Sequence, residues 1–259
     1  MSRLQINEQH FATFEQNGFV SVDDVISPDE LSILQQTCTQ LLEFETGKDE
    51  GDQFDLAGNS RDLSKAKLPQ IMTPSKYAPG LRDLKYREDV KFIAQQLLGD
   101  VVDLINEHLI FKPAHHGGET PWHQDQAYHD PSLRFNSANV WLALDDATVE
   151  NGCMQYVPGS HRLDVLPHHN IGNDPTAAGL EVDYPEKYSG QAVACPVRAG
   201  CVVIHRSYVL HYAGPNLTVK PRPAYVLVFG CDPQPRETPL EFPWLTAHHD
   251  GSRSDLGRG

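Results

Sequence analysis

Apolar and polar positions first predict a helical N-terminal region. Residues 27–30, Ser-Pro-Asp-Glu, have the layout of a helix start, with Ser27 as N-cap, Pro28 in the first turn and Glu30 closing a capping box. Apolar residues then recur at helical spacing at Leu31, Leu34, Cys38, Leu41 and Leu42. A second helix is predicted from Arg87 to Leu98, with Gly99 as its C-terminal cap. Residues 47–64 are polar and are interpreted as a loop. Residues 1–100 are therefore expected to be mainly helical.

From residue 101 onward the pattern becomes that of short strands. Alternation over 101–112 places one set of side chains on one face, Asn106, His108, Ile110 and Lys112, and a second set on the other, Ile105, Glu107, Leu109 and Phe111. Further strands are expected at 139–144, 153–157, 192–197, 201–205 and 225–230. Asn151-Gly152 predicts a hairpin between two of them, because both residues tolerate positive φ. Many short strands with Gly and Pro between them favour a barrel or jelly roll.

The domain organisation follows from these two patterns. No repeat or linker divides the chain, so residues 1–259 are expected to form one domain. Within it, 1–100 give mainly helical support, 101–246 form the barrel and 247–259 are a disordered tail. The polar stretch 162–190 has no clear period and is interpreted as a long loop, a feature typical of a lid or binding element.

Composition excludes several classes of function. A net charge of −14 and the lack of a basic stripe argue against a nucleic-acid partner. No apolar run approaches the roughly 20 residues of a membrane span, and the N-terminus lacks the layout of a secretory signal. The 5 cysteines are scattered without a C-x-x-C pair, which favours a reducing cytoplasm over disulfides or a zinc-thiolate site. No obligate protein partner is inferred.

His123-Gln124-Asp125 is the motif that carries chemistry. With 13 histidines in the chain, one such pattern is expected by chance, and a second does occur at 248–250. On an extended segment, residues i and i+2 project to the same side, so an imidazole and a carboxylate can converge on one ion. The first copy follows a predicted strand and precedes a long β-rich region, whereas the second lies in the tail and is interpreted as solvated.

Two later residues complete a candidate iron site. A mononuclear iron oxygenase needs two His and one carboxylate on one face of the metal, with open positions opposite them. His211 is placed to be the third ligand, and Arg222 can grip a carboxylate through two parallel hydrogen bonds. Each alone has a simpler interpretation, a strand-end histidine or a surface arginine. Their order after His123 and Asp125 favours the site.

The chain resembles the phytanoyl-CoA dioxygenase family. The residues that carry the resemblance are 118–125 (GETPWHQD), Trp141, 150–154 (ENGCM), 157–161 (VPGSH), 210–211, 214–216 (GPN) and Arg222. The resemblance is dense over 101–230 and looser before it. It implies a mixed α+β fold, a double-stranded β-helix or jelly-roll barrel buttressed by N-terminal helices.

The resemblance also implies roles for single residues. His123, Asp125 and His211 match the iron ligands, and Arg222 matches the arginine that binds the C5 carboxylate of 2-oxoglutarate. Trp141 matches an aromatic residue beside this cosubstrate, although core packing explains it equally well. His108 and Asn106 match positions that line the cosubstrate site, or are hydrogen-bonded polar groups at a barrel mouth.

Three positions depart from the pattern or stay open. Some relatives carry a cosubstrate-contacting lysine where this chain has Gln70, so that contact is in doubt here. Lys112 lies on the same face as His108, but extension of its ammonium to solvent is the commoner fate of such a lysine. His205, on the strand that leads to His211, is expected in the core or behind a ligand rather than on the metal.

The implied function is that of an Fe(II)- and 2-oxoglutarate-dependent dioxygenase that also uses O2. It is expected to hydroxylate an aliphatic C–H bond of a small molecule or acyl derivative, with release of succinate and CO2. Halogenating relatives lack the carboxylate, so Asp125 argues against halogenation. Two alternatives remain: a cupin-type metalloenzyme without 2-oxoglutarate, and a catalytically silent barrel that binds a ligand or partner. The fold does not fix the substrate, but 128–134 and 162–190 are expected to shape its pocket.

Overall fold

Capping residues correctly predict the start of α2 (Pro28–Glu43) and the end of α4 (Lys85–Leu98). In this computed structural model, which describes residues 6–58 and 65–246, Ser27 Oγ accepts a hydrogen bond of 3.2 Å from the backbone N–H of Glu30 at the start of α2. The Glu30 carboxylate in turn accepts from the Ser27 hydroxyl rather than from its backbone. Helix α4 ends at Gly99, whose φ of +74° is accessible to glycine without strain. Both predicted helices are confirmed, with α4 starting two residues early at Lys85.

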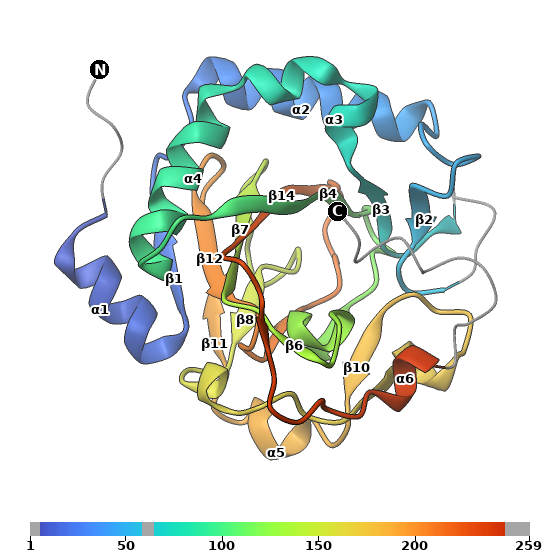
Figure 1. The fold of residues 1–259 in the computed structure, drawn as a ribbon. Helices are drawn as coiled ribbons and strands as arrows, with labels where there is room; N and C mark the ends of the chain where they lie inside the picture. Colours follow the sequence, from blue (N-terminus) through green and yellow to red (C-terminus); the bar gives the residue numbers. More distant parts are fainter. Residues whose placement is uncertain (1–5, 59–64, 247–259) are drawn as a thin grey trace.

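Helices α2, α3 and α4 lie along the upper side of the molecule in Figure 1, whereas α5 and α6 lie at its lower edge. The α-helices are α1 (Glu8–Asn17), α2 (Pro28–Glu43), α3 (Pro74–Tyr77), α4 (Lys85–Leu98), α5 (Glu186–Ser189) and α6 (Pro243–Thr246). The 3-10 helices are η2 (Pro79–Asp83), η3 (Asp125–Tyr128), η4 (Ser160–Arg162) and η5 (Ile171–Asn173). None of the described helices is long and apolar enough to cross a membrane.

Two antiparallel sheets form the body of the protein. The larger has seven strands in the order β1-β12-β7-β14-β4-β3-β2, and the smaller has four in the order β11-β8-β13-β5. The strands of the larger sheet are β1 (Phe19–Val22), β2 (Gln53–Asp55), β3 (Pro69–Met72), β4 (Asp103–Lys112), β7 (Ser137–Ala143), β12 (Val202–Arg206) and β14 (Arg222–Gly230). Those of the smaller are β5 (Thr120–His123), β8 (Met154–Tyr156), β11 (Val193–Cys195) and β13 (His211–Ala213).

This arrangement confirms the predicted α+β jelly roll with N-terminal helical support. The described strand ladders stay in separate sheets and do not close into one continuous barrel. Residues 1–100 contribute more to the sheet than predicted, because β1, β2 and β3 pair with barrel strands or with one another. The predicted loop 47–64 contains β2, while its residues 59–64 lie outside the described part of the chain, as does the predicted tail 247–259.

Two further loop predictions are corrected. Asn151-Gly152 does form a turn, with φ of +86° at Gly152, but it joins β7 of the larger sheet to β8 of the smaller one. The hairpin prediction is therefore wrong. Asn151-Gly152 determines only the local turn, whereas the sheet that each flanking strand joins depends on contacts that are distant in sequence. The stretch 162–190 is not one long loop: it holds β9 (His168–Asn170) paired with β10 (Leu180–Val182), followed by α5. A last small pair joins β6 (Leu133–Arg134) to β15 (Gln234–Pro235).

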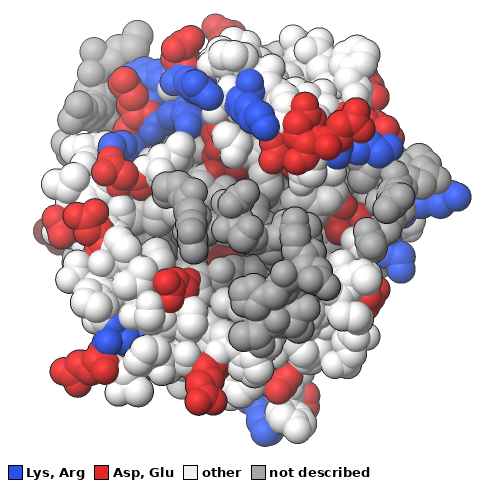
Figure 2. Space-filling view, turned by 45° about the vertical axis from the view of Figure 1, so that its right-hand side comes forward, with Lys and Arg blue, Asp and Glu red and all other residues white. Residues whose placement is uncertain are grey.

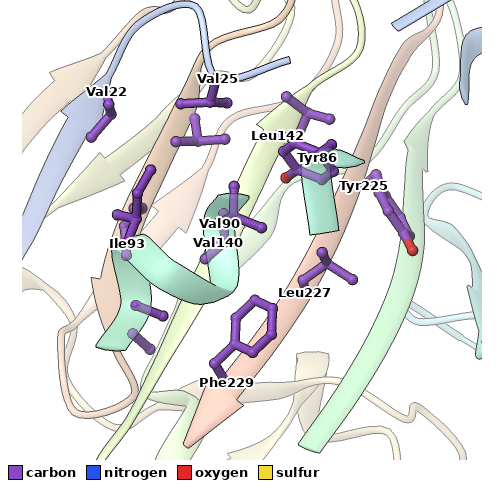
Figure 3. Close-up of a cluster of buried hydrophobic side chains, with 14 of the residues drawn as sticks. Val22, Val25, Tyr86, Val90, Ile93, Val140, Leu142, Tyr225, Leu227 and Phe229 are labelled. Carbon is purple, nitrogen blue, oxygen red and sulfur yellow. The ribbon is translucent and has the colours of Figure 1, made fainter. Parts of the chain in front are cut away.

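Side-chain alternation gives the seven-stranded sheet two different faces. We call the face that packs on the helices the outer face and the one that meets the four-stranded sheet the inner face. Figure 3 shows the outer face, where buried Tyr225, Leu227 and Phe229 of β14 meet Val90 and Ile93 of α4. The inner face carries the intervening residues of the same strands. The predicted faces of β4 are confirmed except at Ile105. A register shift interrupts the pairing of β14 with β4 beside this residue, and Ile105 therefore packs with the hydrophobic residues of the inner face.

Candidate active site

Two histidines face each other across the smaller sheet. His123 ends β5 and His211 begins β13, and the two are register partners with ring centroids 4.1 Å apart. Each Nδ1 lies near the carbonyl two residues earlier, 2.8 Å from Pro121 O and 3.0 Å from Val209 O. Because a carbonyl only accepts, each Nδ1 carries the proton and each Nε2 presents a lone pair. Burial, together with the nearby His123, holds the pKa of His211 well below its usual value, which keeps the ring neutral.

Asp125 completes the group of three. It begins η3, and its Oδ1 lies 3.6 Å from the Nε2 of His123 and 3.6 Å from the Nε2 of His211. Burial opposes ionisation, but the neighbouring imidazoles of His211, His123 and His205 outweigh it and hold the pKa of Asp125 well below its usual value. The three ligand atoms all lie within 4.8 Å of one another, and no other such group occurs among the described residues.

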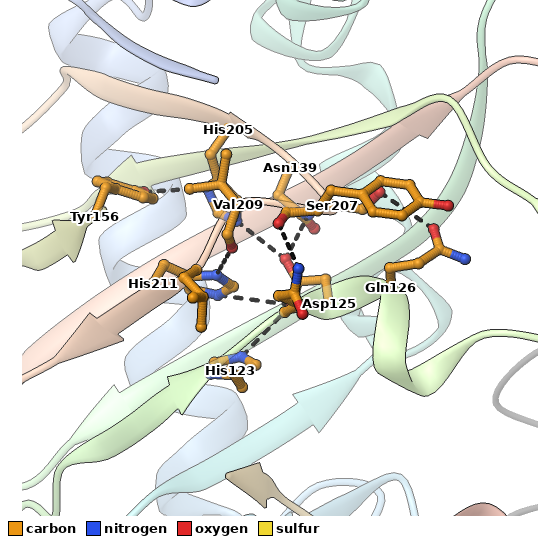
Figure 4. Close-up of polar contacts among 12 residues, drawn as sticks. His123, Asp125, Gln126, Asn139, Tyr156, His205, Ser207, Val209 and His211 are labelled. Atoms are coloured by element: carbon orange, nitrogen blue, oxygen red, sulfur yellow. Dashed lines mark hydrogen bonds and ion pairs between the residues drawn. The ribbon is translucent and has the colours of Figure 1, made fainter. Parts of the chain in front are cut away.

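The donor set fits a divalent iron. Two imidazoles and one carboxylate that converge in this way are the ligands of non-haem Fe(II) oxygenases, which need open positions opposite them. Figure 4 shows the three side chains, from η3 and two strands, pointing toward one another. The fold thus places His123, Asp125 and His211, the three ligands expected from the sequence, side by side.

Arg222 begins β14 on the inner face and is almost fully buried, with 1% of its surface exposed. Its guanidinium lies over the Trp141 ring at 5.1 Å, and its Nε and Nη1 have no hydrogen-bond partner among the described residues. Burial lowers the pKa of Arg222 to about 10, so the group stays cationic at neutral pH. A buried cation with unused donors requires an anion, and a carboxylate fits its paired N–H groups.

The register of the inner face orders the remaining candidates along the sheet. Lys112 is opposite Arg222 at one end. Two steps along, past Ala224, Val226 lies between His108 on β4 and Trp141 on β7. The next step places Val228 between Asn106 and Asn139, and Asn139 contacts Asp125. His108 Nδ1 and Asn106 Oδ1 are buried without a partner in the described structure. Trp141 and His108 thus lie between Arg222 and the neighbours of Asp125 along the inner face.

The sequence interpretation of Lys112 is also wrong. Its side chain does not extend to solvent: it is fully buried, and Nζ donates to Gly118 O, Ala213 O at 3.2 Å and Thr120 Oγ1 at 3.4 Å. Burial and the positive charge of Arg222 hold its pKa well below the usual value. Gln70 is also on the inner face, beside Ile110, where its amide N–H contacts the Met72 sulfur at 2.9 Å.

Sequence reasoning missed two residues that support Asp125. Asn139 Nδ2 donates to Asp125 Oδ2 at 2.7 Å, and Tyr156 OH lies 3.0 Å from Nδ1 of His205. His205 itself, expected in the core or behind a ligand, places Nε2 3.0 Å from Asp125 Oδ2. The alternation of Asn139 with Trp141 on one predicted strand was a signal that could have found Asn139. The second H-x-D at 248–250 lies outside the described residues.

The outer surface adds little to this picture of the site. On the face shown in Figure 2, acidic and basic side chains are interspersed and gather together along the upper edge. The two kinds of charge alternate there, although the whole chain has a net charge of −14.

Comparisons with known proteins point to one family. The sequence model of phytanoyl-CoA dioxygenase (PhyH) matches residues 14–224. Phytanoyl-CoA dioxygenase domain-containing protein 1 of Bos taurus is 26% identical over 252 residues, covering 82% of this chain and 86% of that protein. Ectoine dioxygenase of Sphingopyxis alaskensis is 25% identical over 259 residues, covering 93% and 83%. The crystal structure of EvdO2 from Micromonospora carbonacea var. aurantiaca, complexed with 2-oxoglutarate, has a TM-score of 0.80 and 37% identity, covering 94% and 98%.

Proposed function

Because the chain belongs to the phytanoyl-CoA dioxygenase family of non-haem iron, 2-oxoglutarate-dependent dioxygenases, we propose that it hydroxylates an aliphatic C–H bond of a small molecule or acyl derivative, with His123, Asp125 and His211 holding the iron. The predicted family and the predicted cofactors, Fe(II), 2-oxoglutarate and O2, are confirmed by the comparisons. The metal ligands, the cosubstrate contacts and the single domain over 1–259 are part of the proposal. A cytoplasmic location stays a prediction.

Two groups of buried side chains that can each bind part of one ligand carry the proposal. At one end, two histidine Nε2 atoms and one carboxylate oxygen converge within 4.8 Å of one another. At the other, the buried Arg222 has donors without an acceptor. A molecule with a chelating group at one end and a carboxylate at the other satisfies both, and 2-oxoglutarate has this form. A cupin-type metalloenzyme without 2-oxoglutarate leaves the buried Arg222 unexplained, and a catalytically silent barrel explains neither the triad nor the arginine.

Each residue has a defined task in this proposal. Arg222 binds the distal carboxylate through paired N–H groups, while the Trp141 ring beneath it restricts where that carboxylate can lie. His108, with an unpaired Nδ1, lies between Arg222 and the metal ligands and can bond to the cosubstrate. When bound, iron with 2-oxoglutarate and O2 supplies the oxidising chemistry and releases succinate and CO2. Asp125 occupies the third protein position, which leaves no place for a halide and favours hydroxylation.

The substrate class follows from the relatives only in outline. Their names associate them with different small molecules: phytanoyl-CoA in one case and ectoine in another. We propose a small-molecule substrate for this chain as well, approaching from the side of Tyr128–Arg134 and the β9–β10 pair. Exchange of these segments for those of a relative is expected to change which substrates support turnover. An unchanged substrate profile would contradict their role.

The test begins with metal and cosubstrate, without substrate. Anaerobic addition of Fe(II) and 2-oxoglutarate to the full chain is expected to give a visible charge-transfer band, which His211→Ala abolishes. His169→Ala, which removes a partly exposed histidine on β9, is the matched control and should retain the band. Absence of the band in the wild type, or its survival in His211→Ala, would contradict the proposal. Succinate release is then measured across a panel of small molecules to find the substrate.

A further inference from the structure

The two oxygens of Asp125 have different surroundings. Oδ1 faces the two histidine Nε2 atoms, each at 3.6 Å. Oδ2 faces away from them and receives two hydrogen bonds, from Asn139 Nδ2 at 2.7 Å and from His205 Nε2 at 3.0 Å. A carboxylate whose second oxygen already has two donors presents only the first to a metal. The arrangement therefore favours a carboxylate that binds through one oxygen and leaves coordination positions open.

The bond from His205 fixes where its proton lies. An ionised carboxylate can only accept, so Nε2 of His205 must donate. A neutral imidazole then has an acceptor at Nδ1, and within the described part of the chain the partner of that nitrogen is Tyr156 OH, at 3.0 Å. The hydroxyl of Tyr156 must therefore donate. The direction of every proton from Tyr156 through His205 to Asp125 is set by the carboxylate at the end of the chain (Figure 4).

Tyr156 is held firmly enough to fix the His205 ring. The Tyr156 side chain is fully buried on β8, and its ring stacks on that of Phe19, with centroids 4.5 Å apart and planes at 16°. A buried phenol keeps its proton at neutral pH, because burial disfavours the phenolate. Phe19 belongs to β1 of the larger sheet and Tyr156 to the smaller one, so this contact joins the two sheets directly behind His205.

We propose that Tyr156 is a positioning residue of the metal site, which acts through His205 to keep Asp125 bound through one oxygen. This inference rests on the proposed function, because it takes Asp125 as a metal ligand. Without the Tyr156 hydroxyl, His205 can adopt the other tautomer or turn, and Oδ2 loses one of its two donors. The carboxylate is then free to turn both oxygens toward the metal.

The experiment measures Co(II) binding to the metal-free full chain, because Co(II) reports affinity and coordination without turnover. Loss of a residue that orients a ligand typically weakens metal affinity by about 10–100-fold. We expect His205→Gln to weaken Co(II) binding within that range and Tyr156→Phe to weaken it by about 10-fold. Both variants should change the visible Co(II) spectrum in the same direction, because both free Oδ2. Thermal unfolding of each metal-free variant separates this effect from a loss of fold.

The double variant distinguishes action through His205 from general packing. If Tyr156 acts only through His205, adding Tyr156→Phe to His205→Gln weakens Co(II) binding no further. Tyr86→Phe is the matched control, because Tyr86 is also fully buried but its hydroxyl has no partner among the described residues. It should leave Co(II) affinity and spectrum unchanged.

Two results would overturn the inference while leaving the proposed function intact: wild-type affinity in Tyr156→Phe, or an equal loss on adding Tyr156→Phe in both backgrounds. Failure of the wild type to bind Co(II), or equal binding by His211→Ala, would overturn both.

Discussion

Glu107 and His108 are neighbours on β4, yet they lie in opposite electrostatic surroundings. Glu107 points to the outer face, where it accepts hydrogen bonds from Ser75 N at 3.1 Å, from Tyr225 OH at 2.6 Å and from Arg87. His108 points to the inner face, where its buried Nδ1 has no partner in the described structure. The same strand thus carries a satisfied buried charge on one side and unsatisfied polar atoms on the other.

This difference separates groups that hold the fold from groups that bind ligands. Buried polar atoms in folded proteins are nearly always paired, and each exception requires an explanation. The outer-face cluster of Arg87, Glu107 and Tyr225 pairs its charges within the chain. On the inner face, Arg222, His108 and Asn106 all retain unpaired buried atoms. We infer that the inner face is complete only with its ligands, and substitutions on the two faces should therefore have opposite consequences.

The largest expected loss of stability comes from Arg87→Met on the outer face. The Arg87 and Glu107 side chains are 14% and 3% exposed, so removal of the guanidinium leaves a buried carboxylate without its counter-charge. Such a change costs about 3–5 kcal/mol in the free energy of unfolding, measured by urea denaturation. Lys91→Met on the same helix breaks only the exposed pair with Asp103 and should cost less than about 1 kcal/mol. Similar losses in both variants would contradict the contrast between buried and exposed pairs.

Arg222→Met should reverse this outcome on the inner face. The substitution removes a buried cation that has no counter-charge among the described residues, so stability should be unchanged or increased. Affinity for 2-oxoglutarate should fall by about 2–5 kcal/mol, or at least about 30-fold, because the distal carboxylate loses its partner. Calorimetric titration of the Co(II)-loaded protein measures this loss. Arg198→Met, at a residue whose side chain is 70% exposed, is the control and should retain wild-type affinity. Strong destabilisation by Arg222→Met with unchanged cosubstrate binding would mean that the arginine is structural.

The sequence predicted the parts of this contrast that depend on local spacing. Alternation over 101–112 correctly placed Glu107 and His108 on opposite faces, and the i, i+2 spacing placed His123 and Asp125 together. The buried position of Lys112 was not predictable in this way, because its three acceptors come from β13 and from residues 118 and 120. The bonds of Asn139 and Tyr156 likewise join segments that are distant in sequence. Such contacts depend on which strands pair, and strand pairing is fixed by the whole fold.

Acidification offers a test of the outer face that needs no ligand. Burial favours the neutral form of Glu107, but hydrogen bonds from Ser75, Tyr225 and Arg87 outweigh it and hold the pKa of Glu107 below 4.5. A carboxyl whose pKa is lower in the folded chain stabilises the fold above its unfolded pKa, and this stabilisation is lost as pH falls through the folded pKa. Glu107→Gln should therefore be less stable than the wild type at neutral pH, with a difference that shrinks on acidification.

Urea unfolding at a series of pH values measures this difference. Each unit by which the two pKa values differ contributes about 1.4 kcal/mol. Glu150→Gln, at an exposed position in a turn, should show no such pH-dependent difference. A constant gap between Glu107→Gln and the wild type from neutral to acidic pH would show that the carboxylate charge does not stabilise the outer face.

At Lys112 on the inner face, the pH dependence of stability should have the opposite sign. Burial and the charge of Arg222 hold the pKa of Lys112 well below its usual value of 10.5, so the folded chain releases this proton at a lower pH than the unfolded chain does. Between those two pKa values the unfolded state binds more protons, and the stability contributed at this position rises with pH.

Lys112→Met removes the titrating group while keeping a side chain of similar length, so wild-type stability relative to this variant should increase on alkalinisation. Three hydrogen bonds to neutral acceptors offset part of the cost of burying the ammonium. Urea unfolding of both proteins from neutral to alkaline pH measures the relative stability, and Lys67→Met, at an exposed lysine, should run parallel to the wild type. A wild type that instead loses stability relative to Lys112→Met as pH rises would mean that Lys112 is a stabilising charge like Glu107, and the inner face would then not differ from the outer one at this end of the sheet.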